Sequence, residues 1–340
     1  ADHNTAFGHY ALTANTTGTQ NVAVGALALD ANVDGNYNIA VGRATLSENI
    51  DGNNNVAVGL NALFANTTAN NNTALGHGAL TNNTTGSPNT AVGAFCLAAN
   101  TTGARNSALG YYTLYANTSG VNNSAFGDSA LASNTTANNN SAFGYNSLNV
   151  NTTGGANVAV GAYALDSNTT ASDNTAIGFN CLADNSTGAY NTGVGRSALG
   201  SNTTAANNTA VGYGCLQSNT TGTENTATGY QALISCTTGN ENTAVGRKAL
   251  LGVGTGGLNT AVGRDAGFAI STGEKNTAIG RSAGNQTTTG SNNASLGFNA
   301  QHPSATSSNN VTLGDSNIGA LRCAQTSITS LSDERDKTEI

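Results

Sequence analysis

Aromatic side chains recur along this 340-residue chain with a 17-residue period, a spacing that would place them in one column of a repetitive fold. Such a column offers apolar ring faces against which sugar rings could pack. This column could therefore form a glycan-binding face, and ordinary surface variation is the other interpretation. The candidate binding residues are Tyr111, Tyr145, Phe179, Tyr213 and Tyr230.

Three arginines, Arg247, Arg264 and Arg281, continue the same column toward the C-terminus. Guanidinium groups match the geometry of carboxylates and phosphates, so this ladder could hold an anionic glycan. The alternative is that the arginines are simply solvated beside neighbouring acidic residues, which are Glu224, Glu241 and Glu274.

Cysteine and histidine form no recognisable site in this sequence. No C-x-x-C pair occurs and the four histidines are scattered, so we expect neither a zinc site nor a cofactor. Three cysteines fall in a column that otherwise holds Ala, Thr or Ser, which predicts small buried side chains; they are Cys96, Cys181 and Cys215. No Ser/His/Asp constellation and no paired carboxylates recur, so we expect no metabolic enzyme.

The composition argues against two classes of partner. Only 9% of the residues are charged and the formal net charge is −7, so we expect no nucleic-acid binding. No apolar run approaches the roughly 18 residues of a membrane helix, so we expect no membrane insertion. The chain has no Met and starts inside a repeat, from which we expect it to be a segment of a longer protein.

A 17-residue repeat with the consensus N-T-A-V-G-x-x-A-L-x-x-N-T-T-G-x-x must position these side chains. Counting the first Asn as position 0, it runs through 19 copies from Asn4 to Asn310 without insertion or deletion. Position 4 is Gly in every copy, and position 2 is Ala in the first 17 copies except at Gly193. This regularity contradicts disorder, which the low charge alone would allow.

Each repeat column predicts a local structure. Positions 1 and 3 form one face of a short strand, and the Ala at position 2 indicates a close approach of two backbones on the other face. Gly at position 4 predicts a corner with positive φ, and Ala-Leu at positions 7 and 8 begins a second short strand with Leu inward. The N-T-T-G segment is a turn, and stacked Asn at positions 0 and 11 would form amide ladders.

These columns predict an all-β fold, a parallel β-solenoid or β-roll with one turn per repeat. A helical solenoid is excluded because about ten residues between turns are too few for a helical pair. Position 8 changes from Leu to Gly near residue 260, which divides the chain. We expect regular repeats over 1–258, variant repeats over 259–300, a neck over 301–331, and a different region from 332 to 340.

The N-T-A-V-G-x-x-A core resembles the S-V-A-I-G-x-x-A head repeat of trimeric autotransporter adhesins (YadA-like), and the resemblance extends over most of the chain. In that family, each chain forms a left-handed parallel β-roll and three rolls pack around a threefold axis. The resemblance therefore implies a left-handed solenoid and a homotrimer, in which the Ala column would face the axis. The 17-residue turn of this chain departs from the shorter turn of that family.

The last residues, S-D-E-R-D-K-T-E-I, are similar to the junction before the intramolecular chaperone of endosialidase-type phage tail spikes and fibres. That chaperone trimerises the fibre and then cuts itself off between Ser and Asp. The resemblance implies self-cleavage between Ser332 and Asp333, with Ser332 as nucleophile and Lys337 as its base, and makes 332–340 the start of the chaperone region. A charged, solvated tail is the alternative.

We therefore expect a structural or adhesive fibre shaft, extracellular on a virion and most similar to a phage tail fibre. Its expected partners are two further copies of the chain and a host cell-surface glycan or other receptor. A bacterial trimeric surface adhesin is the first alternative. An ice-binding solenoid is a remote one, because the adjacent Thr-Thr of the turn would point its side chains in opposite directions in a strand.

Overall fold

The computed structural model describes residues 2–320, which contain nineteen short strands and no helix. One strand occurs in each repeat, at positions 1 to 3, and two strands also include the Asn at position 0. The strands are β1 (Thr5–Phe7), β2 (Val22–Val24), β3 (Ile39–Val41), β4 (Val56–Val58), β5 (Thr73–Leu75), β6 (Asn89–Val92), β7 (Asn106–Leu109), β8 (Ser124–Phe126), β9 (Ser141–Phe143), β10 (Val158–Val160), β11 (Thr175–Ile177), β12 (Thr192–Val194), β13 (Thr209–Val211), β14 (Thr226–Thr228), β15 (Thr243–Val245), β16 (Thr260–Val262), β17 (Thr277–Ile279), β18 (Ala294–Leu296) and β19 (Val311–Leu313).

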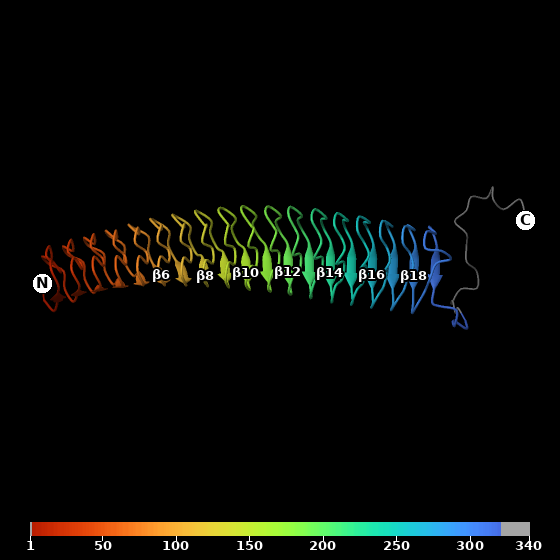
Figure 1. Cartoon of the computed structure of the whole chain (residues 1–340), viewed down its shortest axis with the longest axis horizontal. Helices are drawn as coiled ribbons and strands as arrows, with labels where there is room; N and C mark the ends of the chain where they lie inside the picture. Colours follow the sequence, from red (N-terminus) through yellow and green to blue (C-terminus); the bar gives the residue numbers. More distant parts are fainter. Residues whose placement is uncertain (1, 321–340) are drawn as a thin grey trace, which may run out of the picture.

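Each strand pairs with the next in parallel, and the paired residues occupy the same repeat position, as for Val158 with Thr175. The turns stack into a long, gently curved rod with all strands along one side (Figure 1). This confirms the predicted parallel β-solenoid. The predicted second strand at positions 7 and 8 is wrong, because those residues form a turn.

The glycine at position 4 makes a corner that no other residue fits. Its φ lies between 111° and 142° from Gly8 to Gly297, a region that L-residues rarely adopt. A Cβ on Gly144 would lie 2.6 Å from both the carbonyl carbon and the oxygen of Gly161 in the next turn. The predicted positive-φ corner is therefore confirmed, and stacking of the turns adds a second reason for glycine.

One continuous core runs along the inside of the solenoid and is filled by small and branched side chains from three repeat positions. Ala at position 2, the small residue at position 7 and Leu at position 8 are fully buried, as in Ala142, Ser147 and Leu148. The expectation that the Ala column faces a threefold axis is therefore wrong, because these methyl groups fill the interior of their own chain. The one Gly in this column, Gly193, has its missing Cβ position only 2.6 Å from the Sγ of Cys181.

The leucines reach the core from an unusual backbone conformation. Leu148 has a φ of 50°, and each Leu at position 8 is close to that value. The left-handed conformation costs about 1–2 kcal/mol per residue, and burial of a Leu side chain returns about 1.5–3 kcal/mol. In the repeats of β16 and β17 the same position is glycine, where positive φ carries no steric cost. At position 11, buried Ile270 contributes to the core in the β16 repeat, and Thr287 is buried at the same position in the β17 repeat.

Two buried ladders of asparagine hold the turns together, as the sequence predicts. At position 0, the backbone N–H of Asn157 donates to Oδ1 of Asn140 at 2.9 Å. At position 11, Nδ2 of Asn151 donates to Oδ1 of Asn134 at 3.1 Å and to the Gly154 carbonyl at 2.9 Å. These bonds satisfy polar groups that would otherwise be costly to bury.

The parallel register continues to β19, which pairs with β18 through Leu296 and Leu313. The last described strand thus lies within the 301–331 segment for which a neck is expected. The strand register continues across residues 259 and 301. The boundaries at 259 and 301 stay predictions.

Candidate functional site

The candidate site is the edge of the solenoid that follows the glycine corner, formed by positions 5 and 6. We call it the edge ladder. The five predicted aromatic residues lie on it and are about half exposed, from 44% for Tyr213 to 50% for Tyr111. The corner glycine directs them outward, because the chain turns away from the sheet immediately before position 5.

The aromatic part of the edge ladder has two sections. In the first, the Tyr112 ring lies 4.3 Å from that of Tyr111, 4.8 Å from Tyr115 and 5.4 Å from Phe95. A hydrogen bond with Tyr112 raises the pKa of Tyr111 above its ordinary value. Sequence reasoning missed Tyr112, although its place beside Tyr111 was the signal.

The second section begins at Tyr145 and includes one position-6 residue that the sequence analysis also missed. The ring of Tyr163 lies 5.3 Å from Tyr145 and 6.1 Å from Phe179, in an edge-to-face arrangement with each. Tyr163 therefore bridges two of the predicted residues that are two repeats apart.

Farther along, two stacked tyrosines lie between two arginines. Tyr213 and Tyr230 stack with ring centroids 5.4 Å apart and planes at 10°. Arg196 lies 5.9 Å from the Tyr213 ring and Arg247 lies 6.0 Å from the Tyr230 ring, at the limit of cation–π contact. The flat faces of these two tyrosines are thus covered by neighbours, so they offer ring edges and hydroxyls to a ligand rather than stacking platforms.

The C-terminal part of the edge ladder is basic. Arg264 pairs with Asp265 at 3.0 Å, and Arg247 reaches the same carboxylate at 4.0 Å. Among residues 2–320, no ion pair joins the arginines of this column to Glu224, Glu241 or Glu274. The carboxylate that pairs with this column is that of Asp265.

We compared the chain with known proteins. No protein family matches its sequence, and no curated protein is similar to it. The edge ladder therefore has to be interpreted from its own geometry.

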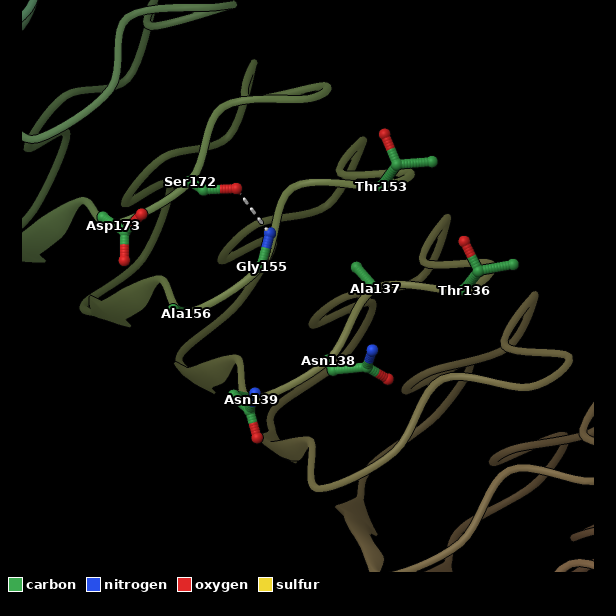
Figure 2. Close-up of a pocket in the computed structure, with 9 residues that line it drawn as sticks. All are labelled: Thr136, Ala137, Asn138, Asn139, Thr153, Gly155, Ala156, Ser172 and Asp173. Atoms are coloured by element: carbon green, nitrogen blue, oxygen red, sulfur yellow. Dashed lines mark hydrogen bonds between the residues drawn. The ribbon is translucent and has the colours of Figure 1, made fainter.

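A different edge carries a polar hollow, formed by positions 13 to 16 of three turns (Figure 2). The hollow is open and has a volume of about 370 Å³. It forms because Gly155 contributes no side chain to the column between Asn138 and Ser172. The Gly155 N–H donates to Oγ of Ser172 at 3.0 Å. Asp173 is its one ionisable residue, so the hollow has no acid–base pair for catalysis.

The four described cysteines are free and buried, which confirms the interpretation of Cys96, Cys181 and Cys215 as core residues. Burial raises the pKa of Cys96 and of Cys181 to about 12. These thiols stay protonated at neutral pH and cannot act as nucleophiles. Within the described part of the chain, no cluster of His, Cys, Asp and Glu could hold a metal ion.

One serine–histidine pair escaped the sequence analysis. Oγ of Ser295 lies 2.7 Å from Nε2 of His302, and Oγ1 of Thr312 lies 3.2 Å from Nδ1 of the same ring. Ser295 occupies position 2, where other turns have Ala, and it is 1% exposed. A substrate cannot reach it and the third member is not a carboxylate, so the group is a structural link between the last two strands.

The self-processing residues predicted from the tail, Ser332, Asp333 and Lys337, lie outside the described residues. Over residues 2–320, the structure contains no helix that is long and apolar enough to cross a membrane.

Proposed function

We propose that the chain is a structural and adhesive fibre shaft that assembles as a homotrimer. The observation that carries this proposal is the outer face of the sheet, made by positions 1 and 3 of every strand. None of the nineteen strands has a charged residue at either position, and position 3 is apolar in all but β14. In β10, for example, Val160 is 37% exposed while Ala159 is buried.

This outer face is large enough for a stable interface. Eighteen steps of about 4.8 Å and strands about 10 Å wide give a face on the order of 850 Å². A typical stable complex buries about 800 Å² on each partner. The apolar side chains of position 3 form a stripe over about half of this face, and exposed apolar patches of more than a few hundred Å² mark interaction surfaces on soluble proteins.

Other copies of the same chain are the partners that fit this face best. A partner must offer an uncharged surface of the same length and the same periodicity of about 4.8 Å, and a second and third copy provide both. Three copies would place the valines and phenylalanines of position 3 around a common axis, in the role first expected for the Ala column. The resemblance to YadA-like heads supports three copies and a left-handed turn.

The position of the fibre on a virion, and its maturation, rest on the resemblance of the tail to a chaperone junction. We propose that cleavage between Ser332 and Asp333 releases a C-terminal trimeriser after assembly, and that the edge ladder contributes to the receptor-binding surface. A bacterial trimeric surface adhesin would use the same solenoid, and the residues that follow the tail in the gene distinguish the two.

A second candidate is ice binding, because β11 to β17 all begin with threonine on the outer face, from Thr175 to Thr277. Regular threonine ladders on a flat β-sheet would suit an ice surface. Position 3 beside them is mostly Val or Ile, which favours the trimer. Thermal hysteresis measured on the purified chain separates the two, because a shaft with its face buried in a trimer would show none.

The trimer is tested by light scattering on the purified chain. We expect a mass three times the 33.7 kDa of one chain. Val160→Lys should dissociate it, because three ammonium groups would be buried together without partners. Ala162→Lys, in the same turn but at position 5, should leave it intact. A monomeric wild type, or a Val160→Lys variant that stays trimeric, would contradict the proposal.

A further inference from the structure

The edge ladder reverses the charge of the chain over three turns. The whole chain has a formal net charge of −7, yet residues 247–281 hold five of its eleven Lys and Arg residues and only two of its eighteen acidic ones. Four of the five cations occupy positions 5 and 6, which places them on one edge; they are Arg247, Lys248, Arg264 and Arg281. We call these four residues, with Asp265, the basic strip.

The positive charge of the basic strip is not balanced within the described chain. Asp265 is the one carboxylate in contact, and it is shared by Arg247 and Arg264. Within residues 2–320, neither Lys248 nor Arg281 has a carboxylate within 4.0 Å. Arginines in successive turns are about one strand spacing apart, about 4.8 Å, so they repel one another and an external anion would relieve that repulsion.

An aromatic ring lies beside each end of the strip, at cation–π distance from Arg281 and at the limit of that distance from Arg247. Arg281 lies 5.6 Å from the Phe298 ring, and Arg247 lies 6.0 Å from the Tyr230 ring. A guanidinium that stacks on a ring keeps its N–H edge free for a carboxylate or phosphate. The strip is therefore partly preorganised for bidentate recognition.

The strip also has room for a sugar residue. An open hollow of about 370 Å³ lies between its arginines, and Phe268 and Ser282 contribute to its wall. Phe268 is 37% exposed and offers an apolar surface, and Ser282 offers a hydroxyl. This combination suits a ring that is apolar on its face and polar at its edge.

We propose that the basic strip binds a linear anionic polysaccharide, one that carries carboxylate or phosphate groups and lies along the solenoid axis. The edge ladder is positively charged over three turns only, and the turns before them present uncharged aromatic side chains. This pattern fits a sparsely charged glycan better than a nucleic acid, which has a phosphate at every residue. The proposal deepens the adhesive role proposed above and rests on it.

Binding of defined polymers to the full chain at low ionic strength tests the proposal. The probes are hyaluronan, which has a carboxylate on every second sugar, a sparsely phosphorylated phosphomannan, neutral dextran, and poly-deoxythymidylate. We expect hyaluronan or the phosphomannan to bind, and the one that binds more tightly identifies the acidic group. No binding of either, equal binding of dextran, or tighter binding of poly-deoxythymidylate would overturn the proposal.

A pair of matched variants locates the site. The double variant Arg264→Gln with Arg281→Gln should weaken binding at least tenfold. The control, Arg43→Gln with Arg105→Gln, removes the same charge from exposed arginines elsewhere, and Arg43 occupies the same repeat position. It should change binding less than twofold, and equal loss in both variants would reduce the effect to overall charge. The mass of the assembly, measured by light scattering, tests the trimer separately from polysaccharide binding. The proposed trimer and the proposed binding strip can therefore each fail without the other.

Discussion

Asn151→Ala should destabilise the middle of the solenoid by interrupting the inner asparagine ladder. The amide of Asn151 donates to Asn134 and to the Gly154 carbonyl, and its Oδ1 accepts from Nδ2 of Asn168 at 2.8 Å. After the substitution, Oδ1 of Asn134 loses its ladder donor. The Gly154 carbonyl still accepts from Asn140 at 2.9 Å, so the new unpartnered groups are the oxygen of Asn134 and the N–H of Asn168 that had donated to Asn151.

The chain provides a matched control at the natural end of this ladder. Cys236 replaces the next asparagine, and Oδ1 of Asn219 is buried without a hydrogen-bond partner. Asn219→Ala removes that unpartnered oxygen and creates one on Asn202, which now receives a bond of 2.9 Å from Asn219. The Asn219→Ala variant therefore has as many unpartnered oxygens as the wild type. It loses the same side-chain volume as Asn151→Ala.

The two variants differ by the ladder bond from Asn168 to Asn151, so Asn151→Ala has one more unpartnered acceptor and one more unpartnered N–H than the control, and the acceptor alone costs about 1–3 kcal/mol. Because turns open locally in a solenoid, hydrogen exchange is the suitable assay. Backbone amides around residue 151 should exchange about 5 to 150 times faster in Asn151→Ala, beyond the change that Asn219→Ala produces around residue 219. Equal acceleration in the two variants would refute the idea that the amide ladder stabilises the stack.

Three further outcomes are expected. Gly144→Ala should prevent stacking around residue 144, because its Cβ would lie 2.6 Å from the backbone of Gly161. The control Gly254→Ala, whose Cβ would have no atom closer than 3.9 Å, should keep the melting temperature of the wild type. Equal melting temperatures of the two variants would contradict the corner argument. Cys96 and Cys181 should resist a thiol reagent in the folded chain and react after unfolding, as mapped by mass spectrometry, and labelling of the native protein would show that the core is open. Burial raises the pKa of these two thiols from 9.0 to about 12, so their contribution to stability is present below about pH 9 and is lost as the pH rises toward 12; an unfolding midpoint that does not fall between pH 9 and 12 would contradict this.

The repeat made the architecture predictable, and the misreadings have physical causes. A Gly or Asn that recurs in every repeat predicts one local structure, so the corner at Gly144 and the side-chain ladder through Asn151 follow from residue type. The Ala at position 2 was ambiguous, because a small residue fits a chain interior as well as an interchain contact. Ala-Leu at positions 7 and 8 looked like a strand, since nothing in the sequence reveals that Leu148 adopts a φ of 50°.

The candidate site was only partly predictable, because its geometry depends on adjacent columns. The position-5 aromatics were visible at fixed spacing, but Tyr163 belongs to position 6, and it bridges Tyr145 and Phe179. Whether the faces of Tyr213 and Tyr230 are free depends on their rotamers and on Arg196 and Arg247. The pairing of Asp265, which lies one turn from Arg247 and beside Arg264, depends on that same geometry.

The uniformity of the outer face creates a problem that the proposed cleavage would solve. Position 3 is nearly the same in every turn, so three shafts shifted by one turn would bury almost the same apolar surface. The largest irregularity is the stacked pair of Phe126 and Phe143, with centroids 4.9 Å apart, which marks one register weakly. A C-terminal trimeriser would align the chain ends before the faces meet, and it becomes dispensable once many turns are in contact. In a chain that carries such a trimeriser after residue 340, Ser332→Ala should therefore yield an uncleaved trimer in correct register. Removal of the trimeriser before assembly should yield trimers of mixed length by electron microscopy. Uniform trimers formed without it would show that the shaft sets its own register.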